Sequence, residues 1–451
     1  MVHQAAITVF YRAPLPIMQD FLPCLFSVIR VPGAHPTMTY ANLIKDQADK
    51  LGISLDHHIL EALINQSPIL AGASGGKDSA CMIILLAKFL NSINYTGEKV
   101  ICHADLGEIE HMESIEEVRR LAKFVRWKLK IVRRVKGGLL ERYTQRWQDN
   151  CKRWANLECV NLISPWPQPH SPFCRSETKV APITQAAVKL FPKAFILNVI
   201  GLRAEESAKR ARNPISKPND KLSRADGTHG RDWFPILHTT IETVWLTHRN
   251  ANFPRHPQYD RGNDRISCAY CFLASKNDWE KGADVSTNHN SYRHITELEI
   301  ISTFSYRQQD WLSDIRPQIL SPTLQAQIET SKAKAAQRKL IEARIPKDLL
   351  FTNSGGRQGW PSFQPTIEQC EIVATVRREI AALMGSEIQR SAGTAILYTT
   401  AETVYDRYAQ LLSQRQTQLR QRARGAKAKR AHATNLQPLM THSVQPALFS
   451  T

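Results

Sequence analysis

The sequence predicts an α/β fold in which a parallel, twisted sheet carries flanking helices and is followed by a helical C-terminal region. Three observations lead to this prediction. Short apolar runs alternate with amphipathic segments over the first two thirds of the chain, and a glycine-rich loop joins the first apolar run to an apolar helix. Beyond about residue 300 the segments are helical and highly charged. Strands that alternate with helices of about 10–15 residues are typical of βαβ units and a parallel sheet.

The expected elements follow in order along the chain. Apolar residues at helical spacing predict helices over residues 39–52 and around 55–64. Strands are expected at 68–71, 100–104, 129–132 and 195–200, and helices at 80–90, 114–125 and from Glu205 onward. Ligands of such sheets bind beyond the carboxyl ends of the strands, so we look for functional residues in the loops that follow them.

The pattern divides the chain into four parts. We expect a poorly structured N-terminal extension over 1–37, an α/β nucleotide-binding domain over 38–300, a helical region over 301–414 and a basic, disordered tail over 415–451. The proline-rich first part is open to other interpretations, as a short ordered arm or as an upstream start assigned in error. Helices are expected in the third part at 324–344 and 366–384, and a long polar helix at 398–424.

Composition excludes some classes of protein. No stretch of the 451 residues approaches the ~18 consecutive apolar residues of a membrane-spanning helix, so an integral membrane protein is excluded. The formal net charge of +18 favours polyanionic partners or anionic substrates. Nine scattered cysteines are too few for a disulfide scaffold, which favours a reducing, cytoplasmic setting.

The most informative stretch is a candidate phosphate-binding loop between the first strand and the next helix. It consists of Ser74, Gly75, Gly76, Lys77, Asp78 and Ser79. Two glycines let the backbone approach an anion, and the amides that open the helix point at it. Lys77 adds a cation and Ser79 a hydroxyl. The loop is not a Walker A motif, because Ala71 and Asp78 stand where that motif has Gly and Ser or Thr.

Four stretches together resemble the phosphoadenosine phosphosulfate (PAPS) reductase-like family of the PP-loop ATP pyrophosphatase superfamily. They are the loop 74–79, His103-Ala104-Asp105-Leu106-Gly107, Gly201-Leu202-Arg203-Ala204-Glu205-Glu206-Ser207, and His256-Pro257-Gln258-Tyr259 with Arg265 and Cys268-Ala269-Tyr270-Cys271. The resemblance implies an adenine nucleotide alpha hydrolase-like fold, with nucleotide phosphates on the glycine loop. It also implies cleavage at the α-phosphate with release of pyrophosphate.

Within this resemblance we expect catalytic roles for Lys77, Asp78, Asp105 and Arg203. Asp105 follows a strand and is expected to hold Mg²⁺ or a ribose hydroxyl, or only to cap the next segment. Arg203 is expected to clamp a phosphate or sulfate with its planar fork, or to pair with Glu205 or Glu206.

One departure from the reductases bears on the substrate. A PAPS reductase uses a nucleophilic cysteine in a C-terminal Glu-Cys-Gly motif, which is absent here; the only late cysteine, Cys370, is flanked by Gln369 and Glu371, with Glu368 one residue further. Nearby carboxylates raise a thiol pKa and lower its reactivity. ATP with Mg²⁺ is therefore the expected substrate, and sulfonucleotide reduction is the alternative.

The cysteines suggest a metal site. Cys268 and Cys271 have the spacing at which two thiolates share a metal, Cys174 lies in a proline-rich loop, and Cys151 and Cys159 are candidates for a fourth ligand, with Cys151 preferred. A 4Fe–4S cluster is one interpretation, Zn²⁺ is another, and a redox-active or unused thiol pair is the third.

A run of seven cations without an acid lies between Arg415 and Arg430 and suits a phosphate backbone, although it is also compatible with a solvated helix end. The sequence thus favours an adenylyl-transfer enzyme, with sulfur transfer onto nucleic acid as the specific hypothesis and a protein partner as sulfur donor. The other hypotheses are a reductase and a non-catalytic subunit that binds nucleotide and nucleic acid.

Overall fold

The computed structural model describes residues 39–352 and 359–435. The expected N-terminal extension over 1–37 lies outside these residues. Within them a six-stranded sheet has the order β3-β2-β1-β4-β6-β5. The strands are β1 (Ile69–Gly72), β2 (Lys99–Asp105), β3 (Lys128–Arg133), β4 (Phe195–Val199), β5 (Ser216–Pro218) and β6 (His229–Trp233). All pairings are parallel except that of β5 with β6, which confirms the predicted fold class.

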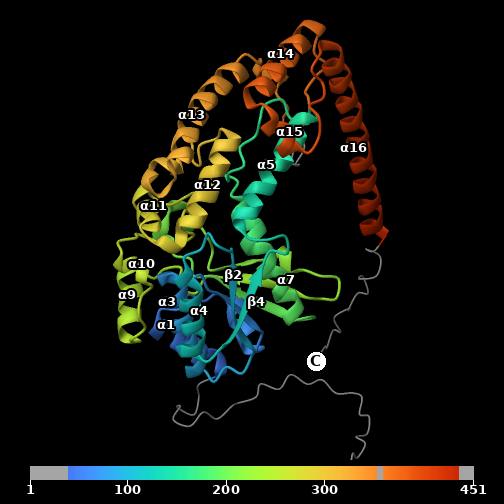
Figure 1. Cartoon of the computed structure of the whole chain (residues 1–451). Coiled ribbons are helices and arrows are strands. Elements are labelled where there is room, and N and C mark those ends of the chain that lie inside the picture. Colours follow the sequence, from blue (N-terminus) through green and yellow to red (C-terminus); the bar gives the residue numbers. More distant parts are fainter. Residues whose placement is uncertain (1–38, 353–358, 436–451) are drawn as a thin grey trace, which may run out of the picture.

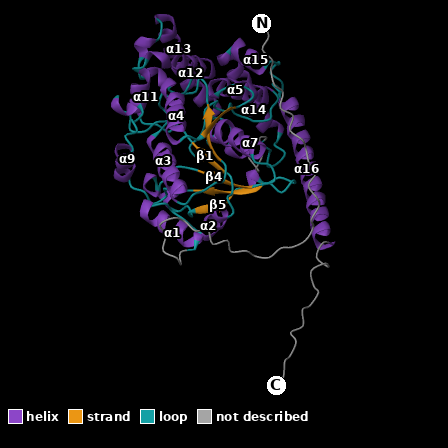
Figure 2. Cartoon of the chain, turned by 90° about the horizontal axis from the view of Figure 1, so that it is seen from below, coloured by secondary structure: helices purple, strands orange, loops and turns teal. Residues whose placement is uncertain are grey.

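The central strand β1 is buried on both faces because its residues alternate between two cores. Ile69 and Ala71 pack with helices α1 (Tyr40–Leu51), α2 (His57–Ile64), α3 (Lys77–Ser92), α4 (Met112–Val125) and α9 (Ile241–Asn250). Leu70 faces the opposite core, which α7 (Ala181–Leu190) covers. Figure 2 shows α3 and α7 on opposite sides of the strands. In register, Ala71 pairs with Ile101 of β2 and Val199 of β4, so the loops after these three strands leave one edge of the sheet together.

A second, helical layer stands beyond that edge (Figure 1). It consists of α5 (Leu139–Ala155), α11 (Lys276–Ala283), α12 (His289–Ser302), α13 (Pro322–Glu342), α14 (Ile367–Met384), α15 (Ser386–Ala392) and α16 (Ala401–Asn435). These helices share one continuous core. Its fully buried aromatic side chains include Trp147, Trp154, Trp166, Trp279 and Tyr306. Short helices α6 (Phe173–Arg175), α8 (Ala208–Ala211) and α10 (Pro257–Asp260) lie in connecting loops.

The guanidinium of Arg377 ties this layer together. It is fully buried and donates to the backbone carbonyls of Trp154, Ala155, Leu397 and Tyr398. Because a buried charge is tolerated only when its donors are satisfied, this residue fixes α14 against the end of α5.

Three expectations about organisation differ from the structure. The boundary expected at residue 300 falls within α12, and α5 packs with the helices that follow residue 300, because its apolar face completes their core. The charged helix expected from Glu205 is only a 3-10 turn, Ala204–Glu206, followed by the four residues of α8. The tail expected to be disordered from residue 415 is helical as far as Asn435, and residues 436–451 lie outside the described part.

No helix in the described ranges is long and apolar enough to cross a membrane.

Candidate functional site

The glycine loop leaves β1 and turns sharply before α3. Gly75 has a φ of +78°, and a Cβ there would stand 2.9 Å from the backbone oxygen of Ser114, so any other residue would be strained and would clash. Ser79 closes the loop from inside: its hydroxyl accepts from the amide of Ser74 at 3.2 Å and donates to the carbonyl of Gly76 at 3.0 Å. The N-cap Gly76 provides no side-chain acceptor for the first amides of α3. The Lys77 amide donates to Tyr259, and the amides that follow it in the first turn are left as donors suited to an anion.

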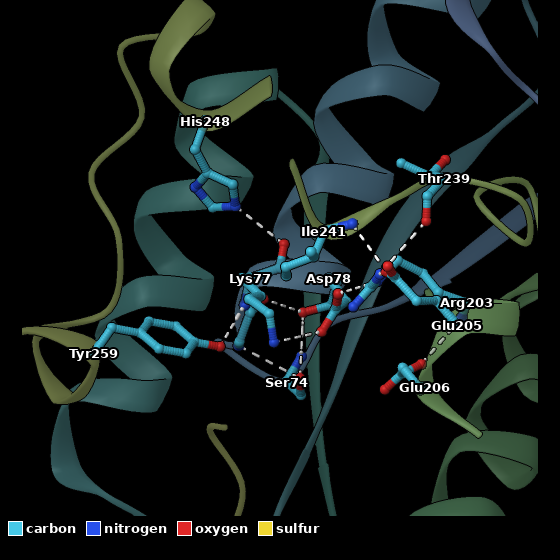
Figure 3. Close-up of polar contacts among 12 residues, drawn as sticks. Ser74, Lys77, Asp78, Arg203, Glu205, Glu206, Thr239, Ile241, His248 and Tyr259 are labelled. Carbon is cyan, nitrogen blue, oxygen red and sulfur yellow. Dashed lines mark hydrogen bonds and ion pairs between the residues drawn. The ribbon is translucent and has the colours of Figure 1, made fainter. Parts of the chain in front are cut away.

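The first two side chains of α3 form a charged chain with Arg203 (Figure 3). Lys77 Nζ lies 3.3 Å from Asp78 Oδ2, and Arg203 Nε donates to Asp78 Oδ1 at 2.7 Å. Arg203 also pairs with Glu205, and its side chain is only 5% exposed. Burial opposes its charge, but the hydrogen bond and charge of Asp78 outweigh burial and raise the pKa of Arg203.

Of the two roles expected for Arg203, the structure contains the pairing with Glu205. Its guanidinium is committed to Asp78 and Glu205, and its amide donates to Glu206 at 3.0 Å. Arg203 therefore positions Asp78, and through it Lys77, in the arrangement shown.

A second clamp comes from the segment 245–266. The hydroxyl of Tyr259 accepts the amide hydrogen of Lys77 at 3.1 Å, and a ring nitrogen of His248 lies 3.0 Å from the carbonyl oxygen of Lys77 (Figure 3). Lys77 Nζ also lies 5.6 Å from the centre of the Tyr259 ring. Both backbone groups of Lys77 are thus fixed by side chains more than 170 residues away in sequence.

His256 anchors this clamp on α4. Its Nδ1 accepts from the amide of Gln258 at 3.1 Å and its Nε2 lies 3.2 Å from the hydroxyl of Ser114, the residue that Gly75 abuts. Burial, and secondarily the neighbouring His111, lower the pKa of His256 to about 4. The imidazole is therefore neutral near pH 7 and can accept from the Gln258 amide.

Asp105 ends β2 and performs the capping role that was one of its two expected functions. Its Oδ1 accepts from the amide of Gly107 at 2.7 Å, and Oδ2 lies 3.8 Å from Arg133. It lines a cavity of about 350 Å³ with Glu108, Glu110 and His111, and none of the loop residues lines that cavity.

The structure brings three of the four predicted metal ligands together. Cys174 lies on α6, Cys268 and Cys271 precede α11, and all three are partly buried against the helical core. Burial raises the pKa of Cys174, and the nearby Cys271 adds to this. The ammonium of Lys179 lies among them: burial opposes its charge, but the charges of Cys268 and Glu110 outweigh burial and raise its pKa.

Cys151, the preferred fourth ligand, lies elsewhere, and this prediction is wrong. Cys151 is fully buried on α5, near Cys159 and Glu387, because its face of the helix packs into the core. Within residues 39–352 and 359–435, no three His, Cys, Asp or Glu side chains form a group that could hold a metal ion. The residues present therefore do not fit the closed four-cysteine site that a 4Fe–4S cluster or structural zinc uses.

Residues 68–274 match the family described as the phosphoadenosine phosphosulfate reductase domain. This span runs from the start of β1 past Cys271 and so includes the loop, both clamps and the cysteines. Over these residues the chain carries a PAPS reductase domain.

Solved structures that are similar to this chain have diverse activities. They include PAPS reductase from Candida auris, at 14% identity and a TM-score of 0.31, which aligns over 50% of this chain and 93% of its own. FMN adenylyltransferase from Candida glabrata, with FAD and inorganic pyrophosphate, aligns over 51% and 72% at 14% identity and a TM-score of 0.30. U34-tRNA thiolase NcsA from Methanococcus maripaludis, with its 4Fe–4S cluster, aligns over 73% and 87% at 14% identity and a TM-score of 0.34. These likenesses are too distant to assign an activity. A search of curated proteins found no significant match.

Outside the PAPS reductase domain, Cys370 lies on α14 and is fully buried in the helical core. Burial raises the pKa of its thiol to about 11. A thiol that is both inaccessible and protonated is a poor nucleophile.

Sequence reasoning missed part of the PAPS reductase domain's site. It identified His256 and Tyr259 only as motif residues and gave them no role, although the resemblance was a signal for them. His248 and Ser114 carry no local signal, because their contacts with the loop depend on the packing of α9 and α4 against α3.

Proposed function

We propose that the chain binds ATP on the loop 74–79, breaks the bond between the α- and β-phosphates, and transfers the adenylyl group to an acceptor. One observation carries this proposal. Helix α3 opens on Gly76 with no side-chain cap, and Lys77 beside it is held by Asp78 and Tyr259. Helix N-terminal amides together with a lysine form a binding site for phosphate groups.

The proposed reaction requires little from the protein beyond positioning and charge. A nucleophilic oxygen of the acceptor forms a bond to the α-phosphorus, and the bond to the bridging oxygen breaks. The electron pair leaves on pyrophosphate, and the acceptor's proton passes to solvent. The loop amides and the Lys77 ammonium neutralise the charge that grows on pyrophosphate, and their fixed geometry makes this stabilisation effective. Mg²⁺, when it arrives with the nucleotide, supplies further neutralisation of the phosphates.

The buried Cys370 supports ATP over a sulfonucleotide as substrate. Reduction of PAPS requires a thiol that attacks sulfur, and the late cysteine of this chain is enclosed in the helical core. Sulfonucleotide reduction would have to use one of the partly buried thiols Cys174, Cys268 or Cys271 instead.

For the acceptor we propose a nucleic acid that receives sulfur, with a partner protein as sulfur donor. The net charge of +18 and the cationic end of α16 support this choice, because phosphate backbones bind through such charge. No step of the proposal passes through a metal.

A second candidate is a subunit that binds nucleotide without turnover. It is favoured by the commitment of Asp78 to both Lys77 and Arg203, which leaves that carboxylate engaged within the protein.

Titration calorimetry with ATP and with PAPS tests the binding step. We expect ATP to bind more tightly than PAPS and Lys77→Ala to weaken ATP binding. Lys88→Ala, on an exposed position of the same helix, is the matched control and should bind normally. Equal binding by both variants would contradict the assignment of the loop.

A further inference from the structure

A groove beside α5 contains more positive charge than its own acids can balance. Its volume is about 640 Å³, and five cations and two acids line it. The cations are Arg142, Arg146 and Arg153 on α5, Arg175 on α6, and Lys221; the acids are Asp149 and Glu177. None of these residues belongs to the nucleotide loop or to its clamps.

The three α5 arginines lie on one face of the helix because they are spaced by four and then seven residues. At 1.5 Å per residue, the eleven positions from Arg142 to Arg153 span about 16 Å. A single phosphate is too small to contact all three. One strand of a duplex places about five phosphates along that length, at 3.4 Å per step.

Several donors of these arginines have no partner within the described residues. They are Nη1 of Arg142, Nε of Arg146 and Nε of Arg153. Arg142 is 7% exposed, and its Nε and Nη2 both donate to Glu177, at 2.5 and 3.2 Å, which fixes the guanidinium and leaves the buried Nη1 without a partner among the described residues. A buried guanidinium donor without an acceptor costs free energy that an incoming oxyanion recovers.

A buried aromatic ring holds the arginine planes. The guanidinium carbons of Arg146 and Arg142 lie 4.4 and 5.2 Å from the centre of the Phe173 ring. Burial, and secondarily the like charge of Arg142, lower the pKa of Arg146, although Glu177 and Asp149 act in the opposite direction. Phe173 itself is 7% exposed, so it supports the arginines and cannot stack on a base.

We propose that this groove binds the phosphodiester backbone of a nucleic acid through Arg142, Arg146, Arg153, Arg175 and Lys221. The proposed contacts go to phosphate oxygens, which carry no sequence information, so binding is expected to be independent of base sequence. Cys174 lies on α6 between Phe173 and Arg175, two residues that line the groove. The role of this nucleic acid as acceptor rests on the proposed function, whereas its binding does not.

Fluorescence anisotropy with a labelled 20-base-pair duplex between ~50 and ~200 mM salt tests the groove. In the full chain, Arg146→Gln with Arg153→Gln should lower the slope of log affinity against log salt by about 1.8 and weaken binding roughly tenfold or more. Arg146→Lys with Arg153→Lys should retain most of the slope, because the charges remain. Lys123→Gln with Lys339→Gln removes the same charge from exposed positions outside the groove and should change the slope much less. Thermal melts of all variants show whether they are folded.

A truncation separates the contribution of the cationic end of α16 to binding from that of the groove. Arg415 donates to the carbonyl of Pro361 at 3.0 Å, so residues 416–451 are removed and Arg415 is kept. The effect of the glutamine pair should persist in the truncated protein. Unchanged affinity of the glutamine pair, or no binding of the duplex by the wild type, would overturn the proposal. Pyrophosphate release measured on the same preparations reports separately on the proposed function.

Discussion

Arg203, after β4, and Asp78, in the first turn of α3, are joined by a hydrogen bond of 2.7 Å from Nε to Oδ1 although 125 residues separate them. This contact fixes the start of the helix on which the phosphate loop ends. The backbones of the two segments also lie close together, since a Cβ at Gly201 would stand 3.0 Å from the carbonyl oxygen of Asp78. The loop is therefore held by its surroundings before any nucleotide binds.

Arg203→Met should lower the free energy of unfolding by about 2–4 kcal/mol, because it leaves the carboxylates of Asp78 and Glu205 without their buried partner. Urea denaturation measures this. Lys50→Met breaks the exposed pair with Asp46 and is the matched control, with a much smaller expected loss. Equal losses in the two variants would show that the Arg203 contact contributes no more than a surface pair.

Tyr259→Phe should weaken ATP binding while the protein remains folded. It removes the acceptor of the Lys77 amide, and an unsatisfied donor costs about 1–3 kcal/mol. Tyr405→Phe, at an exposed ring on α16, is the control. Calorimetric affinities compare the two, and normal ATP binding by Tyr259→Phe would exclude the tyrosine clamp as a determinant of the loop.

Stability should fall as the pH falls from about 6.5 toward 4. Burial lowers the pKa of both His111 and His256 to about 4, so the unfolded chain binds more protons in this range. Each histidine then contributes up to about 1.4 kcal/mol per pH unit, present above 6.5 and lost on acidification. His103 has the opposite effect on the pH dependence of stability, because its pKa is raised. Burial disfavours the protonated imidazole, but the hydrogen bond and charge of Glu110 outweigh the effect of burial.

Denaturation midpoints between pH 5 and 7 measure this dependence. His111→Gln should flatten the curve by up to one proton, and His170→Gln, at an exposed position, should leave it unchanged. If His111→Gln and the wild type have the same pH dependence, His111 is not buried neutral.

The thiols should react according to their placement. Under reducing conditions with a chelator, iodoacetamide should label the partly buried Cys174, Cys268 and Cys271, while Cys151 and Cys370 remain unlabelled until the chain unfolds. Mass spectrometry of digests gives the extent at each site. If anaerobically purified protein contains iron or zinc, Cys151→Ser should not change its amount. Fast labelling of Cys151, or loss of metal in that variant, would restore it as a ligand.

How much the sequence could predict depends on the range of the interactions. The apolar runs of β1, β2 and β4 and the helix after the glycine loop were predicted because periodicity and burial are local signals. β6, His229-Gly-Arg-Asp-Trp233, was missed because a polar strand near the sheet edge lacks the apolar pattern. The glycine loop could be predicted because its residues are consecutive in the sequence. The pairing of Arg203 with Asp78 could not be predicted, since it depends on the packing of β4 beside β1.

The cysteines show the same limit. The spacing of Cys268 and Cys271 correctly indicated that they lie together, and Cys174 joins them through the fold. Cys151 was a candidate only by proximity in sequence, and the apolar face of α5 that carries it inward was not recognised.

The most direct test of the central claim is the product formed from ATP labelled at the γ-phosphate, with a nucleic acid present as acceptor. We expect labelled pyrophosphate, with release about 10²–10³-fold slower in Lys77→Ala and unchanged in Lys88→Ala. Labelled inorganic phosphate, which reports cleavage between the β- and γ-phosphates, or equal pyrophosphate release by Lys77→Ala, would contradict it.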